Sequence, residues 1–126
     1  MGYATSKRWY CVEKINMEYF IHPTSINQIV NQSKKEPVLI LKHSLTCPIS
    51  AGAYMKMTQG LEKGLIPYLT YIVIVQEDRE LSKEIAETFN IKHESPQLIL
   101  IKDGEVLYDT SHGNIQVENI PKIKKI

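Results

Sequence analysis

Residues 38–75 read VLILKHSLTCPISAGAYMKMTQGLEKGLIPYLTYIVIV and contain a complete strand–helix–strand pattern. The run VLIL at the start and the β-branched run YIVIV at the end are typical of strands that are buried on both faces. Between them, apolar residues recur every four positions from Pro48 to about Lys63, which predicts one helix that ends at Gly64. Two strands joined in this way form a parallel pair with a right-handed crossover.

The sequence after this stretch predicts a helix and a hairpin. Apolar residues at helical spacing over Arg79–Asn90, with charges on the other face, indicate an amphipathic helix. Two apolar runs, at residues 97–102 and 105–108, then flank Asp103-Gly104. Asp-Gly is a strong hairpin signal because both central residues of a type I′ turn need a positive φ.

One more helix is expected at each end of this core. Thr24 or Ser25 could cap a helix over Ile26–Asn31. The apolar spacing from Asn114 onward suggests a last helix with a lysine-rich end, although Pro121 weakens that prediction.

The resulting order is βαβαββα, with a mixed sheet of four to five strands covered by helices on both faces. This is the order of the thioredoxin-like α/β fold. We expect a single domain over residues 1–126. Within it, residues 1–23 would be an N-terminal extension, and Trp9–Ile15 could add a strand.

The composition narrows the classes of function. The chain has 126 residues, 43% of them hydrophobic, and a formal net charge of +1, which suits one domain and argues against nucleic acid or a membrane surface as a partner. There is no apolar segment long enough to span a bilayer, and the N-terminus lacks the apolar region of a signal peptide. We therefore expect the chain to stay in the cytoplasm, and we expect it to be a monomer.

The two cysteines, Cys11 and Cys47, are too few for a disulfide framework. No metal site is expected either, because the four histidines do not stand at zinc-ligand spacing from them. A free cysteine is often only a small buried side chain, so the question is whether either thiol does chemistry. For Cys11 we favour an inert buried thiol, and a resolving cysteine is the alternative.

Cys47 lies where the first core strand gives way to the long helix. Pro48 suits the first helical position, which makes Cys47 the N-cap. There its thiolate could accept hydrogen bonds from the N–H groups of Ile49 and Ser50, which would lower the pKa from about 8.5 into the range of roughly 3.5–7.5. The alternative is a tolerated, partly buried cap. Serine, threonine or aspartate would cap better, so we favour a reactive thiolate.

Three neighbours could assist the thiol. Ser50 stands where dithiol redox proteins carry a second cysteine, so the site is monothiol, and its hydroxyl could donate to the sulfur. His43 could help the thiolate as an imidazolium or hold the loop by hydrogen bonds, and both interpretations stay open. The Thr46 hydroxyl could orient the loop or a bound adduct.

These motifs resemble one known family. Lys42-His43-Ser44 followed by residues 46–50, TCPIS, resembles the signature of the monothiol bacilliredoxins, the YtxJ-like proteins of the bacillithiol system. The likeness runs from about residue 25 to the end and includes His93–Gln97, KDG at 102–104 and SHG at 111–113. Leu45 departs from the small or polar residue usual in that loop.

The resemblance implies a function and a substrate groove. Cys47 would remove a low-molecular-weight thiol, by resemblance bacillithiol, from S-thiolated client proteins, with no bound cofactor and with a separate reductase to complete the cycle. Pro96 would be the cis-proline that faces the cysteine in thioredoxin-like proteins. The backbone of Ser95 could then pair with an extended stretch of the client.

Two rival functions remain open from the sequence. One is a monothiol glutaredoxin-like carrier that holds an iron–sulfur cluster between two copies through Cys47, although Pro48 makes close approach of a cluster doubtful. The other is a non-catalytic thioredoxin-like binding or stress module in which Cys47 only senses oxidation.

Overall fold

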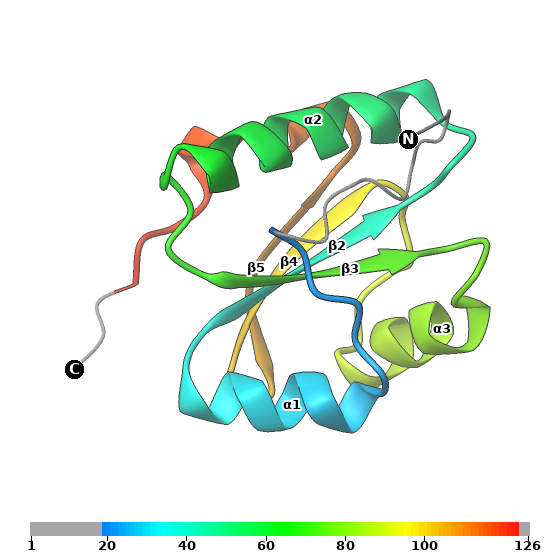
Figure 1. Cartoon of the computed structure of the whole chain (residues 1–126). Coiled ribbons are helices and arrows are strands. Elements are labelled where there is room, and N and C mark those ends of the chain that lie inside the picture. Colours follow the sequence, from blue (N-terminus) through cyan, green and yellow to red (C-terminus); the bar gives the residue numbers. More distant parts are fainter. Residues whose placement is uncertain (1–18, 124–126) are drawn as a thin grey trace, which may run out of the picture.

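A four-stranded mixed sheet forms the centre of the computed structural model, which describes residues 19–123 (Figure 1). The strand order is β3-β2-β4-β5. The central strand β2 (Val38–His43) runs parallel to β3 (Leu69–Ile74) and antiparallel to β4 (Gln97–Lys102), which pairs antiparallel with β5 (Glu105–Ser111). Because β2 and β3 are parallel, both strands end at the same edge of the sheet, where the segment leading to Cys47 begins.

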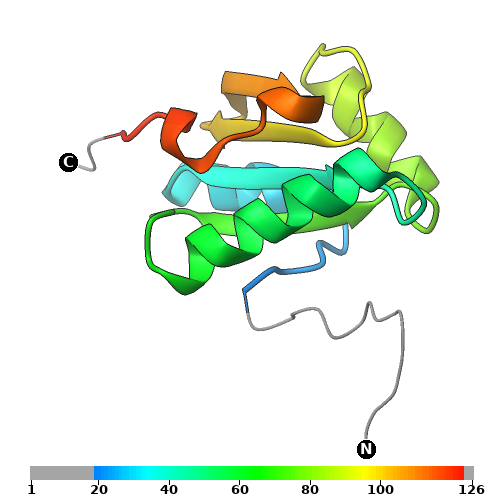
Figure 2. The same ribbon diagram turned by 90° about the horizontal axis from the view of Figure 1, so that it is seen from above.

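Helices cover both faces of this sheet, as predicted. The helix α2 (Pro48–Glu62) lies on one face, and α1 (Ile26–Lys35) and α3 (Arg79–Thr88) lie on the other (Figures 1 and 2). Alternate residues of the central strands therefore enter two apolar clusters. Leu39 and Leu41 pack with α2, whereas Val38 and Ile40 pack on the side of α1 and α3.

Local capping and turn residues act as the sequence predicts. The Ser25 hydroxyl accepts a hydrogen bond from the N–H of Gln28 at the start of α1. Gly64, with a φ of 72°, follows the end of α2. Asp103 and Gly104 both have positive φ, 53° and 76°, as a type I′ turn requires.

The prediction of a last helix from Asn114 onward is wrong for the described residues. The segment after β5 forms two short 3₁₀ turns, η3 (His112–Asn114) and η4 (Val117–Asn119). Its apolar side chains still enter the core, because Ile115 is 1% and Ile120 is 4% exposed. Pro121 cannot donate a helical hydrogen bond, so the apolar pattern is satisfied by turns that pack beside α2.

At the other end of the described range, Ile21 forms a bridge with Tyr71 on β3. The predicted strand at 9–15 and Cys11 lie outside the described residues. No helix in residues 19–123 combines the length and apolarity needed to cross a bilayer.

Tyr68 ties the C-terminal segment to the sheet. Its hydroxyl donates to the carbonyl of Pro121 and accepts from the N–H of Ile123. We expect Tyr68→Phe to lower the free energy of unfolding by about 1–2 kcal/mol in urea titrations, because two hydrogen bonds are lost. Tyr108→Phe is the matched control, since no hydrogen bond of the Tyr108 hydroxyl is found among the described residues, and equal losses in both variants would contradict the assignment.

Candidate functional site

Cys47 lies between the end of β2 and the first turn of α2. It has extended backbone angles, φ −103° and ψ 121°, and Pro48 follows at the first helical position, so Cys47 is the N-cap as predicted. Its side chain is half-buried and forms no disulfide within the described part of the chain. The sulfur is thus placed at the positive end of a 15-residue helix.

The helix start lowers the pKa of the Cys47 thiol. The backbone N–H of Ser50 has the largest effect, burial opposes it, and the N–H of Ile49 and the Ser50 hydroxyl lower the pKa further. The side chain makes no capping hydrogen bond as a thiol, so these donors act mainly on the charged form. The site therefore favours a thiolate, which is the nucleophilic form of cysteine.

Ser50 connects the helix to the loop before the cysteine. Its side chain is fully buried, and its hydroxyl accepts a hydrogen bond from the N–H of Ser44 at 3.2 Å. The same hydroxyl lowers the pKa of Cys47. Ser50 therefore holds the loop before Cys47 in place and also stabilises the Cys47 thiolate.

We expect Ser50→Ala to raise the pKa of Cys47 while leaving it below that of an ordinary thiol, because the Ser50 and Ile49 N–H groups remain. The pH dependence of iodoacetamide alkylation measures this shift. Thr58→Ala, which removes a hydroxyl further along the same helix, is the control. A pKa that is the same in Ser50→Ala and the wild type would show that the hydroxyl has no part in activating the thiol.

Gln76, which was not predicted from the sequence, holds the loop at residues 44–46 by hydrogen bonds. Its side-chain amide donates to Ser44 Oγ at 2.9 Å and to Thr46 Oγ1 at 3.3 Å, and its oxygen accepts from the N–H of Leu45 at 3.1 Å. The Thr46 hydroxyl is thus held within the loop. The available signal was a polar residue directly after the apolar run at 71–75, because two parallel strands end at the same edge of the sheet.

His43 packs behind the site as a neutral side chain. Burial lowers the pKa of His43, and the backbone of Ser50 has a smaller opposite effect. Its ring lies 5.3 Å from the ring of Tyr54, and its Nδ1 is buried without a hydrogen-bond partner in the described structure. Of the two interpretations, a structural role in the loop fits these contacts better than an imidazolium at neutral pH.

The Ser95–Pro96 peptide bond is cis. Gln97, the next residue, pairs with Lys42 in the register of β4 and β2, so Pro96 lies beside the end of β2 from which the Cys47 loop starts. Adjacent strands are about 4.8 Å apart. The Ser95 hydroxyl is buried and has no hydrogen-bond partner within residues 19–123.

The predicted site residues therefore gather at one edge of the sheet. Residues 43–50 come from the end of β2 and the start of α2, and Ser95 and Pro96 come from the loop before β4. Two apolar side chains near Cys47 in the sequence are exposed to solvent, because Leu45 is 41% and Ile49 is 50% exposed. Across residues 19–123, no three His, Cys, Asp or Glu side chains are grouped as metal ligands would be.

A family comparison agrees with the motifs around Cys47. The family model of the monothiol bacilliredoxin BrxC matches residues 20–120. The chain belongs to the monothiol bacilliredoxin family. A solved protein with a thioredoxin fold is similar to this bacilliredoxin over 80% of the present chain and 89% of its own, with 39% identity and a TM-score of 0.70.

More distant structures show the fold alone. Mitochondrial thioredoxin 3 from Saccharomyces cerevisiae has 18% identity and a TM-score of 0.58, covering 75% of this bacilliredoxin and 85% of its own length. Thioredoxin from Fasciola hepatica has 18% identity and a TM-score of 0.55, with 71% and 80% covered. The predicted thioredoxin-like fold is confirmed, and family and fold together make the chain a thiol redox protein.

Proposed function

We propose that the chain is a monothiol thiol–disulfide oxidoreductase that removes bacillithiol from S-thiolated proteins through Cys47. The observation that carries the proposal is the accessible cysteine at the start of α2, with its pKa lowered by the Ser50 and Ile49 N–H groups. Ser50 stands where a resolving cysteine would be. Membership of the monothiol bacilliredoxin family supports bacillithiol as the small thiol.

The reaction consists of two exchanges. The Cys47 thiolate attacks the bacillithiol sulfur of the mixed disulfide, so that a Cys47–bacillithiol disulfide forms and the client cysteine leaves as a thiolate. The thiolate of a second bacillithiol then attacks the bacillithiol sulfur of this adduct, which frees Cys47 and forms bacillithiol disulfide. A separate reductase supplies two electrons to that disulfide. Bacillithiol is thus a co-substrate rather than a bound cofactor.

The surface around Cys47 suits varied protein clients. Exposed Leu45, Pro48 and Ile49 form an apolar rim, and the chain has a net charge of only +1. The Ser95 backbone beside β2 would pair with an extended segment of the client. We propose that the chain acts as a monomer in the cytoplasm, where reduced thiols are available.

The test is single-turnover de-thiolation of a client that carries a bacillithiol mixed disulfide. Reduced chain in slight excess should release the client and acquire one bacillithiol by intact mass, located on Cys47 by peptide mapping. Clients carrying glutathione or coenzyme A are the matched controls and should react more slowly. Client release without an adduct on Cys47 would refute the proposed mechanism, and faster release from glutathione would refute the choice of bacillithiol.

A further inference from the structure

The loop at residues 91–96, between α3 and β4, carries Ser95 and the cis Pro96. We call it the cis-proline loop. Ile91 and Pro96 at its ends form backbone hydrogen bonds with other parts of the chain. For residues 92–95, no hydrogen bond between two backbone groups is found within the described structure. Side chains therefore hold the middle of this loop in place.

Gln97, the first residue of β4, holds the backbone of this loop. Its side chain is buried. Its amide group donates to the carbonyl of Lys92 at 3.0 Å, and its oxygen accepts from the N–H of Glu94 at 3.4 Å. These two hydrogen bonds fix the backbone on both sides of His93.

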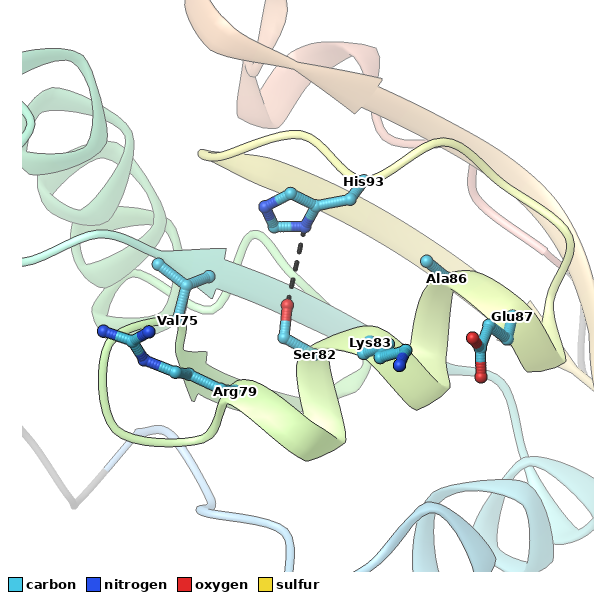
Figure 3. Close-up of a pocket in the computed structure, with 7 residues that line it drawn as sticks. All are labelled: Val75, Arg79, Ser82, Lys83, Ala86, Glu87 and His93. Atoms are coloured by element: carbon cyan, nitrogen blue, oxygen red, sulfur yellow. Dashed lines mark hydrogen bonds between the residues drawn. The ribbon is translucent and has the colours of Figure 1, made fainter.

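Lys42 holds the His93 side chain. It is fully buried on β2, and its Nζ donates to His93 Nδ1 at 3.1 Å and to the carbonyl of Ser82 on α3 at 3.0 Å. An ammonium group has no acceptor, so His93 Nδ1 accepts this hydrogen bond. The same nitrogen lies 3.5 Å from the Ser82 hydroxyl, and Figure 3 shows the ring facing Ser82. Lys42 thus joins β2, α3 and the cis-proline loop.

The two residues that hold the loop are neighbours in the sheet. Lys42 and Gln97 are partners in the register of β2 and β4. Side chains that stand opposite each other on neighbouring strands lie on the same face of the sheet. Since β2 ends directly after Lys42 and leads to Cys47, this pair connects the strand of the nucleophile to the cis-proline loop.

Packing alone does not explain a lysine at this position. Burial lowers the pKa of Lys42 to about 8, so the surroundings disfavour its charged form. No Asp or Glu within residues 19–123 forms an ion pair with it. An apolar side chain of similar volume is often at least as stable as a buried charge. The ammonium is therefore better explained by the groups that it holds than by the stability of the core.

We propose that Lys42 is a positioning residue for the client protein. By holding His93, it keeps the cis-proline loop where the Ser95 backbone can pair with an extended client segment. This inference rests on the proposed function, because the loop receives a client only if Cys47 reacts with proteins. The pKa of Cys47 is changed by burial and by groups at the start of α2, so Lys42 is not needed to form the thiolate.

Single-turnover de-thiolation over a range of client concentrations tests this role. Lys42→Met should raise the half-saturating client concentration about tenfold, which is the effect of losing one or two hydrogen bonds to the client. Alkylation of Cys47 by iodoacetamide should keep its wild-type rate and pH dependence, because this small reagent does not use the loop. Lys34→Met removes an exposed lysine on α1 and should change neither measurement. Slower alkylation in Lys42→Met would show that Lys42 acts on the thiol and would overturn the inference.

Variants of His93 show whether its contact with Lys42 is the cause. His93→Ala should raise the half-saturating client concentration as much as Lys42→Met does, and the double variant should be no worse than either single variant, because both changes remove the same contact. His93→Asn keeps an oxygen acceptor close to the position of Nδ1 and should restore most of the affinity. Additive losses in the double variant would refute the role of this contact.

NMR order parameters of the backbone N–H groups test the loop without any client. Lys42→Met should lower the order parameters of Glu94 and Ser95, and Lys34→Met should not. An active wild type, with the same half-saturating concentration and the same order parameters in Lys42→Met, would overturn this inference and leave the proposed function standing. A wild type that releases no client would refute the proposed function, while lowered order parameters in Lys42→Met would still show that Lys42 holds the loop.

Discussion

Replacing Cys47 by serine is expected to lower the rate of client de-thiolation by at least about a thousandfold, to the level without protein. A serine hydroxyl is almost never ionised at neutral pH and cannot form a disulfide, so both exchanges stop. The rate of client release in single-turnover assays measures the effect. This loss of activity should come from the missing thiol and not from unfolding, because serine is a better N-cap than cysteine. The unfolding temperature of the variant should therefore be equal to that of the wild type or higher.

Cys11→Ser is the matched control within the same chain. It removes the other thiol and should leave the de-thiolation rate unchanged if one sulfur suffices for the first exchange. A large loss in Cys11→Ser, together with an intramolecular disulfide in the oxidised wild type, would replace the monothiol mechanism with a dithiol one. Substantial activity in Cys47→Ser would show that Cys47 is not the nucleophile. A wild type that releases no client above the rate without protein would instead favour the non-catalytic binding module.

Lys42→Met is expected to remove a large pH dependence of stability. Burial lowers the pKa of Lys42 from 10.5 to about 8. Between these two values, the unfolded chain keeps a proton that the folded protein has released, so the free energy of unfolding rises with pH. The rise attributable to Lys42 is about 3 kcal/mol at most. In the methionine variant that contribution is absent.

Urea titrations of the wild type and Lys42→Met between pH 8 and pH 10 measure the difference. The difference between the two unfolding free energies at each pH cancels the contributions of other titrating groups. These include Cys47, whose lowered pKa also makes the free energy of unfolding rise with pH, and Tyr71, whose pKa is raised by burial. Lys34→Met, at an exposed position on α1, should keep the wild-type slope. Parallel curves for the wild type and Lys42→Met would show that the buried ammonium carries no penalty.

The local part of the site could be predicted from its sequence. The N-cap position of Cys47 follows from Pro48, because helix starts are set by dihedral preferences and hydrogen bonds within one turn. The same holds for Ser25 before α1 and for the Asp103-Gly104 turn. The cis bond before Pro96 was expected only through the family resemblance, because most X–Pro bonds are trans.

Contacts between distant residues could not be predicted in this way. Gln76 reaches Thr46 across 30 positions, and Lys42 reaches His93 across 51. Nothing in the spacing of these residues shows that they meet, since the pairing register of the strands decides it. The prediction of a last helix was wrong for a related reason. The apolar spacing of Ile115 and Ile120 indicates only that these side chains are buried, and 3₁₀ turns packed beside α2 bury them equally well.

By itself, the sequence determined the order of elements as far as the hairpin, the helix start at Cys47 and the absence of a second cysteine in the motif. Periodicity, capping and residue identity act over a few residues, so they can be recognised without the fold. The tertiary structure decided that Gln76 holds the Thr46 hydroxyl, that the partly buried His43 ring is neutral, and that the buried Lys42 ammonium meets the Ser82 carbonyl and His93. Burial and long-range hydrogen bonds depend on which strands become neighbours, so these properties exist only in the folded chain.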